Sequence, residues 1–296
     1  MATGELVREE SVVRPVRWRL AALRRAPIVS LSIITLMVLT AVLADVLTPY
    51  SPVDISLPER LRPPFWQPGG SLAHPLGTDP MGRDLLTRMI YGARISLLVG
   101  FLGLCIGGGV GAALGLIAGY AGGRVDAFLM RTTDTALSFP IILFAILLVV
   151  ILGGSLITVV LAVALVLWAR FARVIRGEAL SIRERDFVAQ ARIAGRSPMR
   201  IIVVHLLPNV LNTLVVLLSL QVGWVIIVEA SLSFLGAGVP PPTPTWGSMI
   251  AEGRDYIATA WWVSFFPGLA ILVTVLAFNL FGDWLRDALD PTLRQL

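Results

Sequence analysis

Six apolar runs are the feature that most limits the folds open to this sequence. They cover residues 28–47, 95–119, 136–152, 155–169, 210–235 and 263–281. A helix of about 20 apolar residues crosses the hydrocarbon core of a bilayer, where every backbone amide must find its partner within the protein. Mean hydropathy is +0.82 and only 15% of residues are charged. The sequence therefore predicts an all-α membrane protein with six transmembrane helices.

The polar segments between these runs divide the chain into four expected parts. Residues 1–26 form an N-terminal segment, either a helix lying in the membrane surface or a basic tail. Residues 27–93 hold a first anchor and a proline-rich loop, residues 94–282 a five-helix core, and residues 283–296 a tail. The first run is longer than the 7–15 apolar residues usual in a cleaved signal peptide, so we expect an uncleaved anchor.

The distribution of arginine orients these helices. All 24 basic residues are arginine. With the N-terminus inside, 18 arginines fall in inner segments and 6 in outer ones. Positive residues collect on the cytoplasmic side, so both termini and the polar stretch 178–212 are expected in the cytoplasm. The net charge of +5 then needs no nucleic acid to explain it.

Several chemistries are excluded by the residues present. Without lysine the chain has no P-loop to hold ATP. One cysteine, Cys105, allows no internal disulfide, and two distant histidines make a metal site improbable. No motif brings a nucleophile and a base together. We expect neither an enzyme nor a chain that binds a metal or cofactor itself.

Glycine recurs at every fourth position of the second run, at Gly103, Gly107, Gly111, Gly115 and Gly119. Small residues at this spacing let a second helix approach closely in a membrane. The pattern predicts a tight helix contact, either within this chain or with another subunit.

Two polar features adjoin or interrupt the runs. Glu229 lies near the outer end of the fifth run, and an intramembrane acid either lines a path or is a structural, hydrogen-bonded group. Before the second run, a short amphipathic helix is expected from Asp84, with Arg83, Asp84 and Arg88 on or near its polar side.

The polar stretch 178–212 looks helical rather than loose. Phe187, Ala191 and Ala194 fall at helical spacing, while Gly195 and Pro198 interrupt the pattern. We expect two short helices with a hinge, lying outside the bilayer. Long polar connections of this kind are usually functional, which makes this one the expected coupling element for a soluble partner.

This stretch resembles the EAA loop of bacterial ABC importer permeases. Ala189, Gln190 and Ala191 stand at the first triplet, Gly195 at the glycine, His205 at the isoleucine, and Leu207 and Pro208 at the closing Leu-Pro. The third alanine, the glycine and the Leu-Pro match, whereas the glutamate, the middle alanine and the isoleucine do not. Residues 74–97, 229–250 and 277–291 are similar to stretches of the C-type permease of dipeptide and oligopeptide importers.

The resemblance implies a type I importer permease in the bacterial cell membrane. It would pair with a homologous B-type permease, two cytoplasmic ATPases that bind ATP and Mg²⁺, and an external solute-binding protein. The segment 188–199, with Arg192, Gly195 and Arg196, would dock on an ATPase, and Arg192, Arg196 and Arg200, spaced by four, would form a basic stripe facing it.

The transported solute stays open at this stage. Peptides are the first expectation, but relatives that carry nickel chelates, glutathione or antimicrobial peptides share these motifs. A self-contained secondary transporter is the alternative of another class, and the scarcity of charge near the middle of the runs argues against it.

Overall fold

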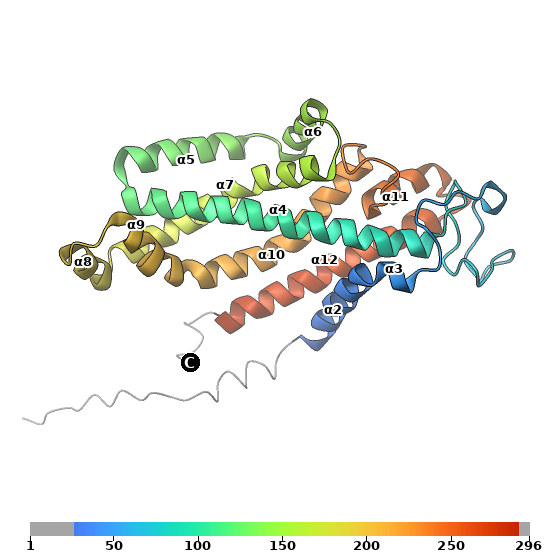
Figure 1. The fold of residues 1–296 in the computed structure, drawn as a ribbon, viewed down its shortest axis with the longest axis horizontal. Helices are drawn as coiled ribbons and strands as arrows, with labels where there is room; N and C mark the ends of the chain where they lie inside the picture. The colour runs from blue at the N-terminus through green and yellow to red at the C-terminus, as the bar shows by residue number, and fades with distance from the viewer. Residues whose placement is uncertain (1–26, 290–296) are drawn as a thin grey trace, which may run out of the picture.

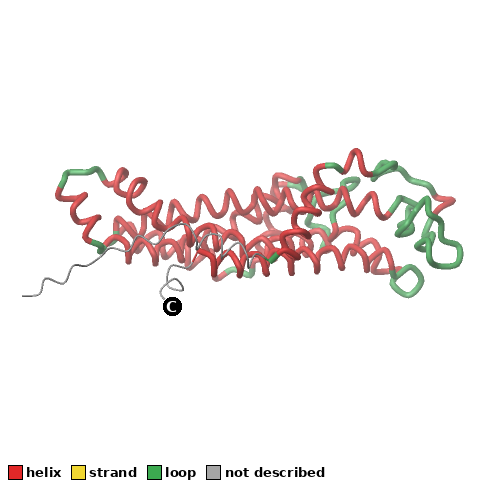
Figure 2. Tube along the Cα trace, turned by 90° about the horizontal axis from the view of Figure 1, so that it is seen from below, coloured by secondary structure: helices red, strands yellow, loops and turns green. Residues whose placement is uncertain are grey.

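The computed structural model describes residues 27–289, most of which are helical (Figure 1, Figure 2). The long helices are α2 (Ile28–Val42), α4 (Leu85–Ala121), α5 (Gly123–Ser138), α6 (Ile141–Leu152), α7 (Leu156–Arg183), α10 (Leu207–Phe234) and α12 (Trp262–Leu289). The short ones are α3 (Ala44–Leu47), η1 (Leu57–Glu59), α8 (Asp186–Ile193), α9 (Pro198–Ile201), η2 (Ile202–Leu206), α11 (Trp246–Gly253) and η3 (Arg254–Tyr256). Across residues 27–289 no strand is present, which confirms the all-α prediction there. The predicted segment 1–26 and the last part of the tail lie outside the described residues.

Side chains and glycines set the ends of the two helices that form the centre of the bundle. Asp84 caps α4 by accepting a hydrogen bond from the backbone N–H of Thr87 at 2.7 Å, and Ser155 caps α7 in the same way. At the other end of α4, Gly122 has a φ of 65°, which a glycine adopts without strain, and the chain turns there into α5.

The five glycines of the predicted stripe in α4 all face α7. A Cβ atom on Gly111 would lie 2.3 Å from the carbonyl oxygen of Trp168, and one on Gly115 would lie 2.6 Å from that of Ala172. The corresponding nearest distances at Gly103, Gly107 and Gly119 are 2.6, 2.8 and 2.6 Å. Only hydrogen fits at these positions, so backbones pack directly together and the helix that fills the stripe belongs to this chain.

Three apolar clusters hold the remaining helices to this central pair. One joins α4, α6, α7 and α10; a second joins α4 and α7 to the segment 188–210; a third joins α2, α4, α10, α11 and α12. Much of the outer surface is apolar as well, as along α12, where Leu269, Leu272, Leu276 and Leu280 are exposed. Such a surface suits a lipid environment and not water.

Length and composition support four or five of the six predicted membrane spans. α4, α7, the continuous segment Pro198–Phe234 and α12 are each long and apolar enough. α5 and α6 pass only as a pair bent by 92°. The 15 residues of α2 rise about 22 Å, less than the roughly 30 Å of a hydrocarbon core, although Ile28–Leu47 as a whole has the full length.

Two sequence expectations about the third span were wrong. Residues 120–135, expected as a polar loop, lie almost entirely in helices, the end of α4 and most of α5, and Asp126 and Asp134 of α5 pair with Arg176 and Arg173 of α7. Residues 136–152 do not form one helix. Pro140 disfavours helical backbone at the preceding Phe139, which is extended (ψ 138°), so the chain bends there.

Polar segments gather at the two opposite ends of the elongated bundle (Figure 1). α8 and α9 lie at one end. The connection between α3 and α4 lies with α11 at the other. Each end contains one group of residues that bears on function.

Candidate functional site

An exposed helical hairpin, residues 184–206, forms one end of the molecule (Figure 1). It contains α8, a turn at Gly195, α9 and η2. The predicted polar stretch began at 178, but α7 continues to Arg183, so the hairpin is shorter than that stretch. Two short helices separated at Gly195 agree with the expected local structure.

The turn of the hairpin is a glycine-dependent helix ending. Gly195 has a φ of 71°, its N–H donates to the carbonyl of Arg192, and the N–H of Arg196 donates to that of Ala191. This is the paired hydrogen bonding of a Schellman motif, which favours glycine at the left-handed position. Ser197 then caps α9 through the N–H of Arg200.

Apolar side chains on one face fix the hairpin to the bundle. Val188 and Ile201 are fully buried, and Ala191 is nearly so. They belong to a cluster with Ile175 and Ile182 of α7. A movement of the hairpin would therefore be passed directly to the end of α7.

The opposite face of the hairpin is exposed on the surface of the molecule. Ala189, Gln190 and every residue from 192 to 200 are exposed, and Ile193 and Met199 expose 88% and 67% of their surface. Exposed apolar side chains beside arginines suit a protein partner better than water alone.

The predicted basic stripe does not lie on one helix. Arg192 belongs to α8, Arg196 to the turn and Arg200 to α9, because the helix is interrupted at Gly195. A spacing of four aligns side chains only along an unbroken helix. Arg192 instead lies over the ring of Tyr120, 5.3 Å from its centroid.

Leu207 and Pro208 lie where the hairpin enters α10. Pro208 has no N–H to donate, and the turn before it is a π-helix, η2. The side-chain amide of Asn209 donates to the carbonyl of His205 at 2.7 Å, satisfying one acceptor in this widened turn. His205 is partly buried, with its ring centroid 6.3 Å from that of Phe187.

Glu229 is fully buried between helices. It accepts hydrogen bonds from the hydroxyls of Ser96 in α4, at 2.8 Å, and Ser233 in α10, at 2.7 Å. Both donors are side-chain hydroxyls. In this arrangement the carboxylate joins α10 to α4.

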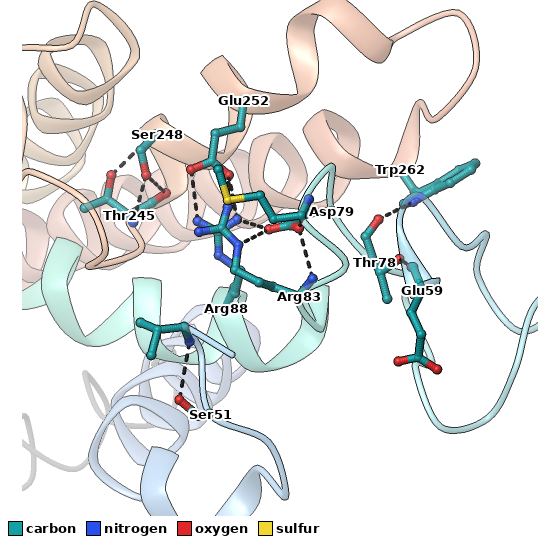
Figure 3. A network of polar contacts seen from close by, with 12 residues as sticks. Ser51, Glu59, Thr78, Asp79, Arg83, Arg88, Thr245, Ser248, Glu252 and Trp262 are labelled. Atoms are coloured by element: carbon teal, nitrogen blue, oxygen red, sulfur yellow. Dashed lines mark hydrogen bonds and ion pairs between the residues drawn. The ribbon is translucent and has the colours of Figure 1, made fainter. Parts of the chain in front are cut away.

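The opposite end holds a buried ionic cluster formed by Asp79, Arg83, Arg88 and Glu252 (Figure 3). Arg83 Nε lies 2.6 Å from Asp79, Arg88 contacts the same carboxylate, and both arginines reach Glu252 of α11 at 2.6–2.8 Å. Asp79 is fully buried and Arg88 is 1% exposed. The cluster attaches the segment before α4 to α11.

The histidine beside this cluster is also enclosed by acids. Both ring nitrogens of His74 lie 2.9 Å from carboxylates, one from Asp84 and one from Glu59. From sequence, Arg83, Asp84 and Arg88 were placed on a polar helix side; in the structure all three are buried. Their partners lie up to 169 residues away, and amphipathic periodicity alone cannot distinguish a solvated face from a paired one.

Neither polar end offers a catalytic arrangement or a metal centre among residues 27–289. No group of three or more His, Cys, Asp or Glu side chains there could hold a metal ion. The hairpin instead combines exposure, positive charge and firm attachment to membrane-type helices, the features of a surface that receives a protein partner.

Multi-pass helical membrane proteins with such a hairpin are found in transport complexes. Comparison with known protein families shows which family this chain belongs to. Residues 111–295 match the family described as binding-protein-dependent transport system inner membrane component. Residues 17–64 match the N-terminal TM domain of oligopeptide transport permease C. The first match covers more than half of the chain, which therefore belongs to this family of inner membrane transport components.

Individual relatives are similar over nearly the whole chain. It is 45% identical over 278 residues to the dipeptide transport system permease protein DppC of Escherichia coli (strain K12), covering 94% of this chain and 93% of the relative. It is 43% identical over 277 residues to the di/tripeptide transport system permease protein DppC of Pseudomonas aeruginosa (strain UCBPP-PA14), covering 94% and 91%.

Proposed function

We propose that this chain is a transmembrane permease subunit of an ATP-driven importer for di- or oligopeptides. The single observation that carries the proposal is the similarity along almost the full chain to permeases named for dipeptide or di/tripeptide transport. The chain itself is the non-catalytic part. ATP and Mg²⁺ are bound by partner subunits, in keeping with the lack of lysine and therefore of a P-loop.

The assembly in this proposal has four kinds of component. This chain forms half of the translocation pore and a homologous permease forms the other half. Two ATPases bind on the cytoplasmic side, and a solute-binding protein delivers peptide from outside. The energy for transport comes from ATP hydrolysis by the partner subunits. This agrees with the position of Glu229, the clear intramembrane acid of this chain, which is hydrogen-bonded between two helices.

In the proposed topology six segments cross the membrane, α2–α3, α4, the bent pair α5–α6, α7, α10 and α12. Both termini and the hairpin then lie in the cytoplasm, where the positive-inside rule places most of the arginines. The ionic cluster at the opposite end lies outside, at the surface that meets the solute-binding protein.

The hairpin transmits the motion of the ATPase in this proposal. Its exposed face, with Gln190, Arg192, Gly195 and Arg196, docks on the ATPase, while its buried face holds the ends of α4 and α7. When ATP brings the two ATPases together, the docked hairpins move with them and the helices open outward, and hydrolysis reverses the change.

Gly195→Pro tests this role. Proline fixes φ near −65°, opposite in sign to the 71° at this position, and removes the N–H that bonds Arg192. We expect the variant to insert into membranes normally, to recover much less ATPase on purification, and to lose most peptide uptake. Gly177→Ala is the matched control, because a Cβ there meets no atom within 4 Å.

Two results would contradict the proposal. Unchanged ATPase recovery and uptake in Gly195→Pro would remove the hairpin from the coupling path. Solute movement by the purified chain alone in liposomes, without ATP or partners, would favour a secondary transporter. Uptake assays with nickel complexes, glutathione and antimicrobial peptides beside short peptides would identify the solute.

A further inference from the structure

Arg170 differs from the other arginines of α7. Arg173 pairs with Asp134, Arg176 with Asp126, and Arg183 with Glu184. Within residues 27–289, the side chain of Arg170 forms neither a hydrogen bond nor an ion pair. Its guanidinium instead lies over the ring of Trp224 in α10, 4.3 Å from the centroid.

The depth of this group makes the missing partner significant. Trp224 lies 14 residues after Val210 and 11 before Leu235 in the apolar run of α10. With a rise of about 1.5 Å per residue, the guanidinium is about 21 Å from one end of that run and about 16 Å from the other. Lipid phosphates lie at the membrane surfaces, so none is available there.

The surroundings leave the guanidinium partly accessible. α6 shares an apolar cluster with residues of α7 that precede Arg170, and α5 reaches α7 at Arg173. Arg170 thus lies at the level of the break between α5 and α6 and is half-buried.

From these observations we infer that Arg170, held against Trp224, binds a carboxylate of the peptide cargo midway across the membrane. This inference rests on the proposed peptide-import function. The guanidinium forms two parallel hydrogen bonds to a carboxylate. The indole keeps the arginine in place when no cargo is present, because a ring face attracts a cation.

The test compares three peptides in liposomes that contain the complete importer, ATP and saturating solute-binding protein. Trialanine carries a terminal carboxylate, Ala-Glu-alaninamide a side-chain carboxylate, and trialaninamide none. In Arg170→Gln we expect the uptake efficiency of trialanine relative to trialaninamide to fall about tenfold, as the loss of one charged hydrogen-bonding partner predicts. A similar fall for Ala-Glu-alaninamide would show that either carboxylate is bound; a fall for trialanine alone would assign the site to the terminal one.

Two further variants separate binding from structure. Arg170→Lys keeps the charge and should restore most of the ratio. Arg173→Gln removes a paired arginine one turn away and should change the uptake of all three peptides alike. Equal uptake ratios in wild type and Arg170→Gln would overturn the carboxylate site alone. A wild-type complex that imports none of the peptides would overturn the peptide-import function as well.

A measurement on the unmodified protein covers the case in which Arg170→Gln does not assemble. Ala-Ala-photoleucine, illuminated during ATP-driven uptake, should label α7 or α10 near Arg170 and Trp224. Labelling confined to other helices would overturn the inference.

Discussion

Arg88 lies at the centre of the buried ionic cluster and illustrates how much a single partner matters there. It contacts both Asp79 and Glu252, while its own Nε has no acceptor among the described residues. Taking two charges out of water is expensive, and the pairing offsets that cost only while all members are present. Such a cluster adds little net stability. Its main effect is to fix how the segment before α4 packs against α11.

Arg88→Met should lower the free energy of unfolding by about 3–5 kcal/mol, because Asp79 would lose one of its two cationic partners while remaining fully buried. Thermal unfolding of the purified protein in detergent would measure the loss.

Two controls accompany this prediction. Arg254→Met removes an arginine whose pair with Asp255 is exposed and should leave the unfolding temperature nearly unchanged. The double change Arg88→Met with Asp79→Asn should recover part of the loss, because the carboxylate charge disappears with the arginine. Equal unfolding temperatures for Arg88→Met and Arg254→Met would show that the ionic cluster does not stabilise the fold.

At the scale of elements, the contact between α4 and α7 organises the bundle. The glycine spacing predicted a close helix contact, and the structure shows which helix provides it. The sequence could not choose between a helix of this chain and one of a partner, because the stripe specifies a distance of approach and not the identity of the neighbour.

Gly111→Ala should destabilise this pair by about 1–3 kcal/mol, the cost typical of an overpacked contact. The added methyl group would lie 2.3 Å from the carbonyl oxygen of Trp168 and 2.6 Å from the Cβ of Phe171, and neither backbone can move away without separating the helices. The midpoint of thermal unfolding in detergent would report the change.

Gly109→Ala is the matched comparison in the same helix, since a Cβ there meets nothing within 4 Å. Alanine favours a helix over glycine by roughly 0.5–1 kcal/mol, so this variant should be unchanged or slightly more stable. Similar losses at both positions would mean that the stripe does not set the approach of α7.

For the whole molecule, the arrangement of polar segments at opposite ends predicts a fixed sidedness in the membrane. With Cys105 replaced by serine, single cysteines at Met199 and Leu72, both well exposed, should react with a membrane-impermeant maleimide from opposite sides. A cysteine at Leu272, exposed on the apolar surface of α12, should react slowly from either side, because a thiolate does not form readily in hydrocarbon. Reaction of the first two from the same side would exclude this topology.

Local patterns in the sequence determined much of this protein. Apolar runs gave the positions of α2, α4, α7, α10 and α12, glycine and proline gave the two helices of the hairpin and its turn, and Asp84 marked the start of α4 correctly. These features depend on residues a few positions apart in the sequence, so they can be predicted from the sequence alone.

Only the tertiary structure decided which polar residues find partners. Asp126 and Asp134, in a stretch expected as a loop, lie in helix α5 and pair with α7, and Arg88 is buried because Glu252, 164 residues away, meets it. The same holds for Arg170, which directly follows the fourth apolar run in the sequence and lies over the ring of Trp224 with no ion pair among the described residues. The physical reason is that the free energy of a charge in a membrane protein depends on what lies within a few ångströms of it, and that is determined when distant helices pack together.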